Sequence, residues 1–374
     1  DSVYGESIYT NRVELLGNYQ LPTTEKISLA FSLNHHHQNS IYGNTLYMAK
    51  QQVGFAQMVW DKAIGKHDFL LGTALRYTYY NDNTPATGST DRAKMGTAPQ
   101  RIILPGIFAQ DEISFNEQHK LLVGLRYDYN SAHGNIFTPR IAYKYTINNQ
   151  KFLRLNMGTG FRVVNLFTED HAALSGARKV VLTEQLKPEQ SFNINLNYIH
   201  KIYGKGTAAT TLDFSAFYTY FNNRIVGDFE TDPNQIIYSN LKGHAISKGV
   251  SANADIALNN GIKLNIGATY MDVALYNNQQ KEQQILTERF SGTWSLSYRI
   301  PSIHLDIDYT GNVYSPMRLP LLGPLDPRQP YSPWYSLQNV QFTFHYWHGF
   351  ELYGGVKNLL NFLPTRYSPF LIAR

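Results

Sequence analysis

Apolar and polar residues alternate with a period of two through most of this chain, and that pattern limits its fold more than any other feature. In residues 192–198, apolar side chains alternate with asparagine without a break. In residues 303–310, the odd positions are apolar and the even positions carry acidic, His or Thr side chains. Successive side chains of a strand point to opposite faces, so each segment has one apolar and one polar face. The chain is therefore predicted to be all-β.

The length of these segments distinguishes a membrane barrel from a soluble antiparallel sandwich, which also alternates. The strand-like stretches run to about ten residues or more, whereas strands of soluble proteins are usually near five or six. Tyrosines gather near the ends of the apolar faces, as aromatic girdles do at a membrane interface. Examples are Tyr79, Tyr80, Tyr127, Tyr129, Tyr218 and Tyr220. These features favour a transmembrane antiparallel β-barrel.

Composition agrees with this prediction. Charged residues make up 16% of the chain and aromatic residues 14%, whereas a typical soluble domain carries about 25% charged residues. Mean hydropathy is −0.34, and no run of about 18 apolar residues is present, which excludes a helical membrane protein. A barrel is compatible with that value because only every second residue faces lipid.

Several other classes of protein and site are excluded or disfavoured. Cysteine is absent, which excludes disulfides, thiolate metal sites and cysteine catalysis. The net charge of +5 is small and forms no basic run, so nucleic acid is not expected as a partner. No signal peptide begins at Asp1, so the sequence is expected to be a mature chain or a fragment.

The connections between the predicted strands also alternate. Short polar turns occur at 21–25, 63–66, 115–118, 147–150, 203–206, 259–261, 300–302 and 347–349, and mostly longer connections at 34–45, 81–100, 163–186, 229–236, 276–284 and 316–331. Short turns on the periplasmic side and long loops outside are typical of outer-membrane barrels. Counting in this way predicts about sixteen strands, with the first, at 8–20, running inward.

Five motifs follow one another along the chain: VGLRYD at 123–128, FTPRIAYK at 137–144, GTGFRVVNLF at 158–167, LKPEQS at 186–191 and GVKNLLN at 355–361. In this order and spacing they resemble the TonB-dependent outer-membrane receptors, most closely those of Bacteroidetes-type bacteria. Barrels of that family have twenty-two strands and a globular plug before them. The resemblance therefore implies that residues 1–374 are a partial β-barrel domain, from which the plug, the first strands and the last strand are missing.

The resemblance implies active, TonB-dependent import of a specific substrate across the bacterial outer membrane. A ferric chelate, haem, cobalamin, a metal or another nutrient would fit. The expected partners are outer-membrane lipids, the small-molecule substrate, the TonB complex acting through the missing plug segment, and a surface lipoprotein. No cofactor is expected. The alternative function is a passive diffusion porin, because sixteen strands in under 400 residues is a porin-like size.

Candidate substrate-binding residues lie in the predicted outer loops: His35, His36, His37, Tyr79, Tyr80, His171 and Arg178. The three consecutive histidines could bind a metal, haem iron or a metal chelate. Adjacent residues on a strand face opposite ways, so at most two of them could meet one ion. A polar loop edge is the simpler interpretation of the histidines, and no metal site is assigned.

Candidate residues facing the lumen or a plug are Arg126, Asp128, Arg154, Arg162, Asp306 and Asp308. Arg162 begins the loop 163–186 and could pair with Glu169 or Asp170. That loop could contact substrate or a lipoprotein, or simply brace its neighbours. The proline-rich segment 316–331 is expected to form a stiff loop, part of a lid or docking surface. No catalytic arrangement stands out, so the chain is not expected to be an enzyme.

Overall fold

The computed structural model describes residues 5–91, 93–163, 179–204, 208–232, 234–277, 280–321, 326–346 and 349–367. Nearly all regular structure is antiparallel strand, apart from three single-turn helices, η1 (Pro85–Thr87), η2 (Pro301–Ile303) and η3 (Pro364–Arg366). Among the described residues, no helix is long and apolar enough to cross a membrane.

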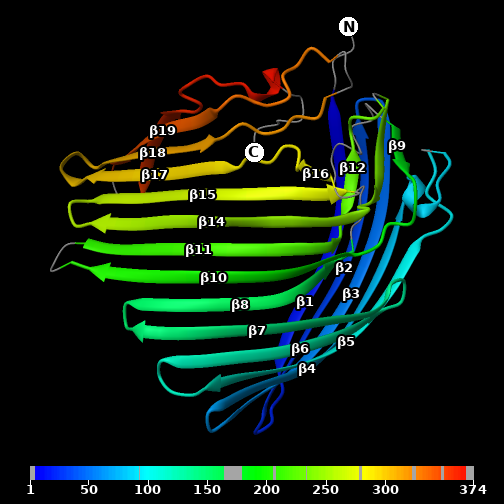
Figure 1. Cartoon of the computed structure of the whole chain (residues 1–374), viewed down its shortest axis with the longest axis horizontal. Coiled ribbons are helices and arrows are strands. Elements are labelled where there is room, and N and C mark those ends of the chain that lie inside the picture. Colours follow the sequence, from blue (N-terminus) through cyan, green and yellow to red (C-terminus); the bar gives the residue numbers. More distant parts are fainter. Residues whose placement is uncertain are drawn as a thin grey trace.

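One sheet of seventeen strands forms a curved wall (Figure 1). Without the short β16 (Gln280–Gln283), which extends a hairpin with β15 (Ile262–Asn277), sixteen strands remain, as predicted. They pair in chain order: β1 (Glu6–Gln20), β2 (Lys26–Tyr42), β3 (Thr45–Ile64), β4 (His67–Asp82), β5 (Gln100–Ser114), β6 (His119–Asn130), β7 (Gly134–Asn148), β8 (Lys151–Arg162), β10 (Glu189–Tyr203), β11 (Ala208–Asn223), β14 (Gly243–Leu258), β15 (Ile262–Asn277), β17 (Phe290–Ile300), β18 (Leu305–Tyr314), β19 (Tyr335–Tyr346) and β20 (Phe350–Val356).

The two ends of the wall differ as the sequence predicts. Short turns join β7 to β8, β14 to β15 and β17 to β18 together on the left of Figure 1, while β9 (Lys179–Leu182) and β12 (Ile225–Asp228) lie at the opposite end. β12, β13 (Gln235–Asn240) and β9 form a small separate sheet within connections that were predicted to be loops. β16 (Gln280–Gln283) also lies in a long connection.

The predicted loop at 34–45 is wrong. β2 and β3 remain paired without interruption from Lys26 with Asp61 to Tyr42 with Thr45. The connection is a two-residue turn in which Gly43 adopts φ +60°, a left-handed conformation that glycine takes without steric cost. His35, His36 and His37 are therefore strand residues of β2 rather than loop residues.

Where the strands cross the membrane they have one apolar and one polar face, and β6 illustrates the rule. On its outer face, Val123, Leu125 and Tyr129 are 44–52% exposed. On its inner face, the Asp128 carboxylate is buried and accepts two bonds of 2.7 Å from the Arg126 guanidinium. Gly106 on β5 makes room for this pair, because a Cβ there would lie 2.1 Å from Asp128 Oδ1. Exposed apolar residues are stable on the outer face only if lipid covers them.

Several strands are much longer than a bilayer requires. A transmembrane strand needs about 9–11 residues, whereas β2 has 17 and β3 has 20. The short turns place the periplasmic ends of these strands level with their neighbours, so the excess length extends outward. This part of the wall therefore rises above the membrane and encloses a space at the mouth. At the two edges of the wall, β1 pairs with β2 and β20 pairs with β19.

Candidate functional site: a vestibule at the outer mouth

The small sheet covers one side of the mouth from within. Val180, Ile236 and Tyr238 of this sheet pack in a buried cluster with Tyr42 and Tyr47 of the inner wall, together with Ala49 and Tyr80. The hydroxyl groups of Tyr47 and Tyr80 lie 2.8 Å apart, so the cluster buries its polar atoms with a hydrogen bond. This side of the mouth is a packed, dry contact between loop and wall.

Asp82, at the outer end of β4, organises the loop between β4 and β5. Its Oδ1 accepts bonds from the Thr84 backbone nitrogen at 2.9 Å, the Thr84 hydroxyl at 2.7 Å and the Thr87 hydroxyl at 2.8 Å. Its Oδ2 accepts a bond of 2.7 Å from the Tyr80 hydroxyl. A buried carboxylate with this many donors fixes the loop to the tyrosine cluster.

Asn240, at the end of β13, ties the small sheet to the segment that enters β10. Its side-chain oxygen accepts a bond of 2.9 Å from the Lys187 nitrogen, and its side-chain nitrogen donates to the Gln185 carbonyl at 2.9 Å. Its backbone nitrogen donates to Glu184 Oε1 at 3.0 Å. The hydrogen bonds that Asn240 makes to the Glu184 carboxylate lower the pKa of Glu184, because they favour the charged form.

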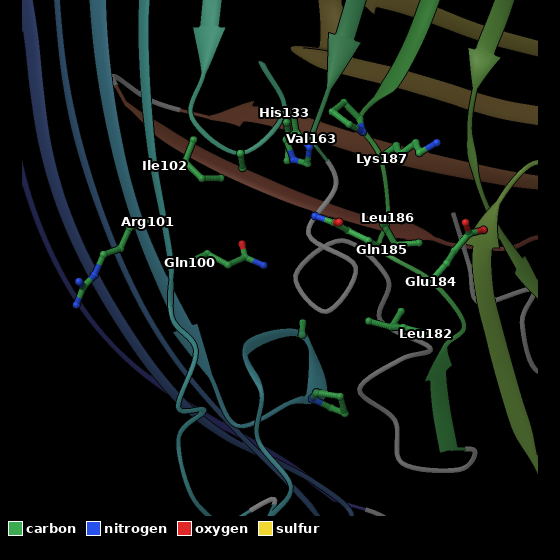
Figure 2. A pocket seen from close by; sticks show the side chains of 14 residues that line it. Gln100, Arg101, Ile102, His133, Val163, Leu182, Glu184, Gln185, Leu186 and Lys187 are labelled. Carbon is green, nitrogen blue, oxygen red and sulfur yellow. The ribbon is translucent and has the colours of Figure 1, made fainter. Parts of the chain in front are cut away.

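A first cavity of about 360 Å³ lies between this segment and the β4–β5 loop (Figure 2). It is lined by Pro85, Ala86, Gln100, Arg101, Ile102, Ala132, His133, Val163, Leu182, Glu184, Gln185, Leu186, Lys187 and Pro188. Figure 2 shows the Gln100 side chain directed into the space and that of Arg101 turned away. Burial lowers the pKa of His133, which favours the neutral imidazole. The cavity therefore has a mixed polar and apolar lining. Its charged residues include Glu184 and Lys187, which are of opposite sign.

A second cavity, of about 430 Å³, lies on the inner wall next to the first. Arg162 on β8, Glu189 on β10 and Arg224 after β11 line it, with Ser191 and Ser247. Glu189 Oε2 accepts bonds of 2.7 and 3.1 Å from Arg162, and its Oε1 accepts the Ile225 backbone nitrogen at 3.0 Å.

Arg224 gives this cavity a positive excess. Its guanidinium lies 5.6 Å from the centre of the Phe221 ring, and burial lowers its pKa. Among the residues that the structure describes, one carboxylate faces two guanidinium groups here, an arrangement that favours an anion.

A third cavity, of about 380 Å³, shares Arg224 with the second and extends toward the β18–β19 connection. There Arg318 forms an ion pair of 2.6 Å with Glu230 of the β12–β13 loop. Met317 and Leu319, beside Arg318, are buried with Tyr335. The described part of the proline-rich connection is therefore anchored to the wall, and the three cavities together form a vestibule, by which we mean the space that they line.

The candidate loop residues are dispersed. His36 lies on the inner face of β2, whereas His35 and His37 lie on the outer face. Tyr80 belongs to the inner tyrosine cluster, but Tyr79 faces outward with the Arg101 guanidinium 6.0 Å from its ring. Within the described ranges, no group of three or more His, Asp or Glu side chains is placed to hold a metal ion. His171 and Arg178 lie outside the described residues.

The candidate lumen residues all lie on the inner face, in separate places. Arg126 and Asp128 pair with each other, and Arg154 lies opposite Lys144 and Asn197. Near the periplasmic end, Asp306 accepts bonds of 2.7 and 2.9 Å from Arg299, and His345 lies 3.0 Å from it. Asp308 accepts a bond from the Ser297 hydroxyl.

Of these candidates, only Arg162 reaches the vestibule. Glu169 and Asp170, its predicted partners, lie outside the described residues. Sequence reasoning missed Glu189, Arg224 and Asn240. The motif LKPEQS contains Glu189, which was the available signal for it, but Arg224 and Asn240 carry no local signal.

Comparison with known proteins gives a consistent result. The sequence matches the family described as TonB dependent receptor-like, beta-barrel, over residues 4–359. It is 31% identical over 120 residues to the iron-regulated outer membrane virulence protein of Vibrio cholerae serotype O1, which covers 32% of this chain and 18% of that protein.

Solved structures share the fold. The siderophore receptor PirA from Pseudomonas aeruginosa aligns with a TM-score of 0.68 and 15% identity, over 96% of this chain and 60% of that one. A variant of the ferric enterobactin receptor PfeA from Pseudomonas aeruginosa, in complex with enterobactin, gives 0.70 and 15%, over 95% and 57%. The copper transporter OprC gives 0.70 and 12%, over 96% and 60%.

The chain spans less than a fifth of the curated relative and about three-fifths of these structures. These neighbours are named as receptors and transporters. The family match covers nearly the whole wall, the inner face is polar and the outer face is apolar. The chain therefore belongs to the TonB-dependent receptor family of β-barrels and is located in the bacterial outer membrane.

Proposed function

We propose that the protein of which this chain forms the barrel wall imports a specific small molecule across the outer membrane, with energy supplied through TonB. The observation that carries this proposal is the family match along residues 4–359. A vestibule at the outer mouth, built by loops that pack onto the inner wall, provides a place for the substrate to bind first.

The proposed domain organisation is a partial barrel. Unpaired strand edges are costly in lipid because water cannot hydrate their backbone groups. We therefore infer that further strands complete the wall beside β1 and β20, and that a plug fills the lumen. A barrel of twenty-two strands is too wide for its own side chains to close. The paired charges on the inner face, such as Arg126 with Asp128 and Arg299 with Asp306, would lie against that plug.

The substrate is proposed to be an anion or an anionic complex. Two guanidinium groups, of Arg162 and Arg224, and one carboxylate, of Glu189, are the charged groups among the described residues that line the second cavity. Both oxygens of Glu189 already accept hydrogen bonds. Among the broader candidates, a negatively charged ferric chelate suits this cavity better than a free metal cation. The described part of the segment 316–331 is anchored on the wall, so we propose that it borders a lid or a docking surface for a lipoprotein.

A direct test is uptake of radiolabelled ferric chelates by cells that express the complete protein, with and without an active TonB complex. Accumulation should require TonB and should stop when a protonophore dissipates the proton gradient. In a separate measurement, the purified complete protein should show no large steady conductance in planar bilayers. Uptake that persists without TonB, together with such a conductance, would support the passive porin instead.

A further inference from the structure

A group of charged side chains lies on the lipid-facing side of β14, β15 and β16, near the outer end of the wall. Lys248 on β14 is the register partner of Asp272 on β15. Lys281 Nζ on β16 lies 2.9 Å from Asp272 Oδ2, and Arg289 Nη2, just before β17, lies 4.0 Å from Asp272 Oδ1. Two cations thus pair with one carboxylate, and a third, Lys248, lies opposite it in the strand register. We call Lys248, Lys281 and Arg289 the outer cationic cluster.

The cluster faces outward, not into the vestibule. Lys248 and Asp272 lie two residues from Val250 and Tyr270, and therefore on the same face. Val250 is 55% exposed and Tyr270 is 56% exposed, as expected of side chains that contact lipid. The side chains of Lys281 and Arg289 are about half exposed, so they can reach a ligand.

An apolar groove of about 460 Å³ lies directly below the cluster on the same face. Ala252 and Ala268, which are register partners, form its floor. Tyr198 and Phe214, with ring centres 6.5 Å apart, border it on one side, and Tyr270 and Phe290 border its upper edge. The groove exists because small outward-facing residues on neighbouring strands are flanked by large rings.

The spacing between the cluster and the groove corresponds to that of a lipid headgroup and its chains. Each two-residue step along a strand covers about 7 Å, so the row of Lys248 lies about 14 Å above the row of Ala252. Trp334 is 57% exposed, and its ring centre lies 6.0 Å from that of Phe290, which marks the interface between headgroups and chains. Cations on the lipid side are costly in the hydrocarbon core but cost little at the headgroup level.

We propose that this sector binds a phosphate-bearing lipid of the outer leaflet. The phosphate would contact the outer cationic cluster, and an acyl chain would occupy the groove. Charge complementarity and the shared outward face favour a lipid over a soluble anion, because a soluble anion would have no use for the apolar groove below. The site is separate from the vestibule, so it does not depend on what the protein imports.

The test uses the complete protein purified in detergent and bisphosphorylated lipid A as the probe, with binding followed by native mass spectrometry. The wild-type protein should retain the lipid, and the triple variant Lys248→Gln, Lys281→Gln, Arg289→Gln should bind it at least about tenfold more weakly. Ala252→Phe should also weaken binding, because it fills the groove while leaving the cations in place. Dephosphorylated lipid A should bind to the wild-type protein as weakly as bisphosphorylated lipid A binds to the triple variant.

Lys50 provides a matched control, since it is an exposed, outward-facing lysine on β3, away from the cluster. Lys50→Gln should leave binding unchanged, and heat-modifiable mobility on gels should show that every variant keeps a folded barrel. The proposal is overturned if the triple variant retains lipid like the wild type. It is also overturned if inorganic phosphate alone displaces the lipid and Ala252→Phe has no effect, which would indicate a site for soluble anions.

Discussion

The two sides of the vestibule are built in opposite ways. On one side, Tyr47, Tyr80 and Asp82 bury their polar atoms against the small sheet and satisfy them with hydrogen bonds inside the protein. On the other side, Arg162, Glu189 and Arg224 line a cavity of about 430 Å³ and carry a positive excess. The first arrangement resists movement, whereas the second leaves charge available for a ligand. The tyrosine side of the vestibule is therefore expected to be a fixed support, and the arginine side is expected to bind the ligand.

The largest expected effect comes from removing Asp82. Asp82→Ala would leave the Tyr80 hydroxyl and the Thr84 nitrogen without their acceptor in a buried place. We expect the unfolding free energy of the mouth region to fall by about 3 kcal/mol, measured as urea-dependent protease cleavage of the β4–β5 loop. The exposed Asp91, which caps a turn at Ala93, is the control: Asp91→Ala should cost less than about 1 kcal/mol. Equal effects of the two variants would show that the tyrosine side is not a fixed support.

A somewhat smaller loss of unfolding free energy is expected when a substitution leaves a cavity between the small sheet and the wall. Ile236 is 2% exposed in the tyrosine cluster, so Ile236→Ala should destabilise the mouth by about 2 kcal/mol. Ile266, which is 48% exposed on the outer face, is the control, and its alanine variant should affect barrel stability much less. Hydrogen exchange at the amides of β13 would report the difference. Unchanged protection in Ile236→Ala would contradict the role given to this contact.

Substitutions of the arginines that line the second cavity should weaken ligand binding and leave the stability of the barrel almost unchanged. Arg162→Gln and Arg224→Gln should each weaken binding of an anionic ferric chelate by about tenfold, or about 1.4 kcal/mol, measured by tryptophan fluorescence quenching. Arg76→Gln is the matched control, because Arg76 faces the lumen on β4 and its hydrogen bond to Thr78 is long, at 3.4 Å. If Arg76→Gln weakened binding of the ferric chelate as much as the other two substitutions do, the positive charge of the second cavity would not explain the loss of binding.

The smallest effect concerns pH. The folded pKa of Glu184 lies below the ordinary value of 4.5, because Asn240 donates hydrogen bonds to the carboxylate. Its contribution to holding the segment that enters β10 is therefore fully present above about pH 4.5 and is lost as the pH falls through the lowered folded pKa. Hydrogen exchange at the Asn240 amide should accelerate in that acid range, and Glu184→Gln should remove the pH dependence. The same acid response in Glu184→Gln would assign it to another group.

Much of the wall was predictable because its signal is local. Alternation within single segments predicted an inner position for Arg126, Asp128, Arg154, Asp306 and Asp308, and the strand register places them on one common face of the wall. The histidines at 35–37 show where local reasoning failed. Polar residues near a strand end resembled a loop, but β2 continues to Tyr42 because its partner β3 extends equally far. A strand above the membrane can be polar on both faces, so its sequence pattern weakens while its pairing continues.

By itself, the sequence determined the class of fold, the approximate number of strands and which face of each strand meets lipid, because each follows from side chains within one segment. Only the tertiary structure decided which residues meet at the mouth. Arg162 finds Glu189 across 27 positions of the chain, and Arg318 finds Glu230 across 88. Such contacts depend on strand register and on loops that fold back onto the wall, and that free energy is shared among segments far apart in sequence. No single segment carries the signal.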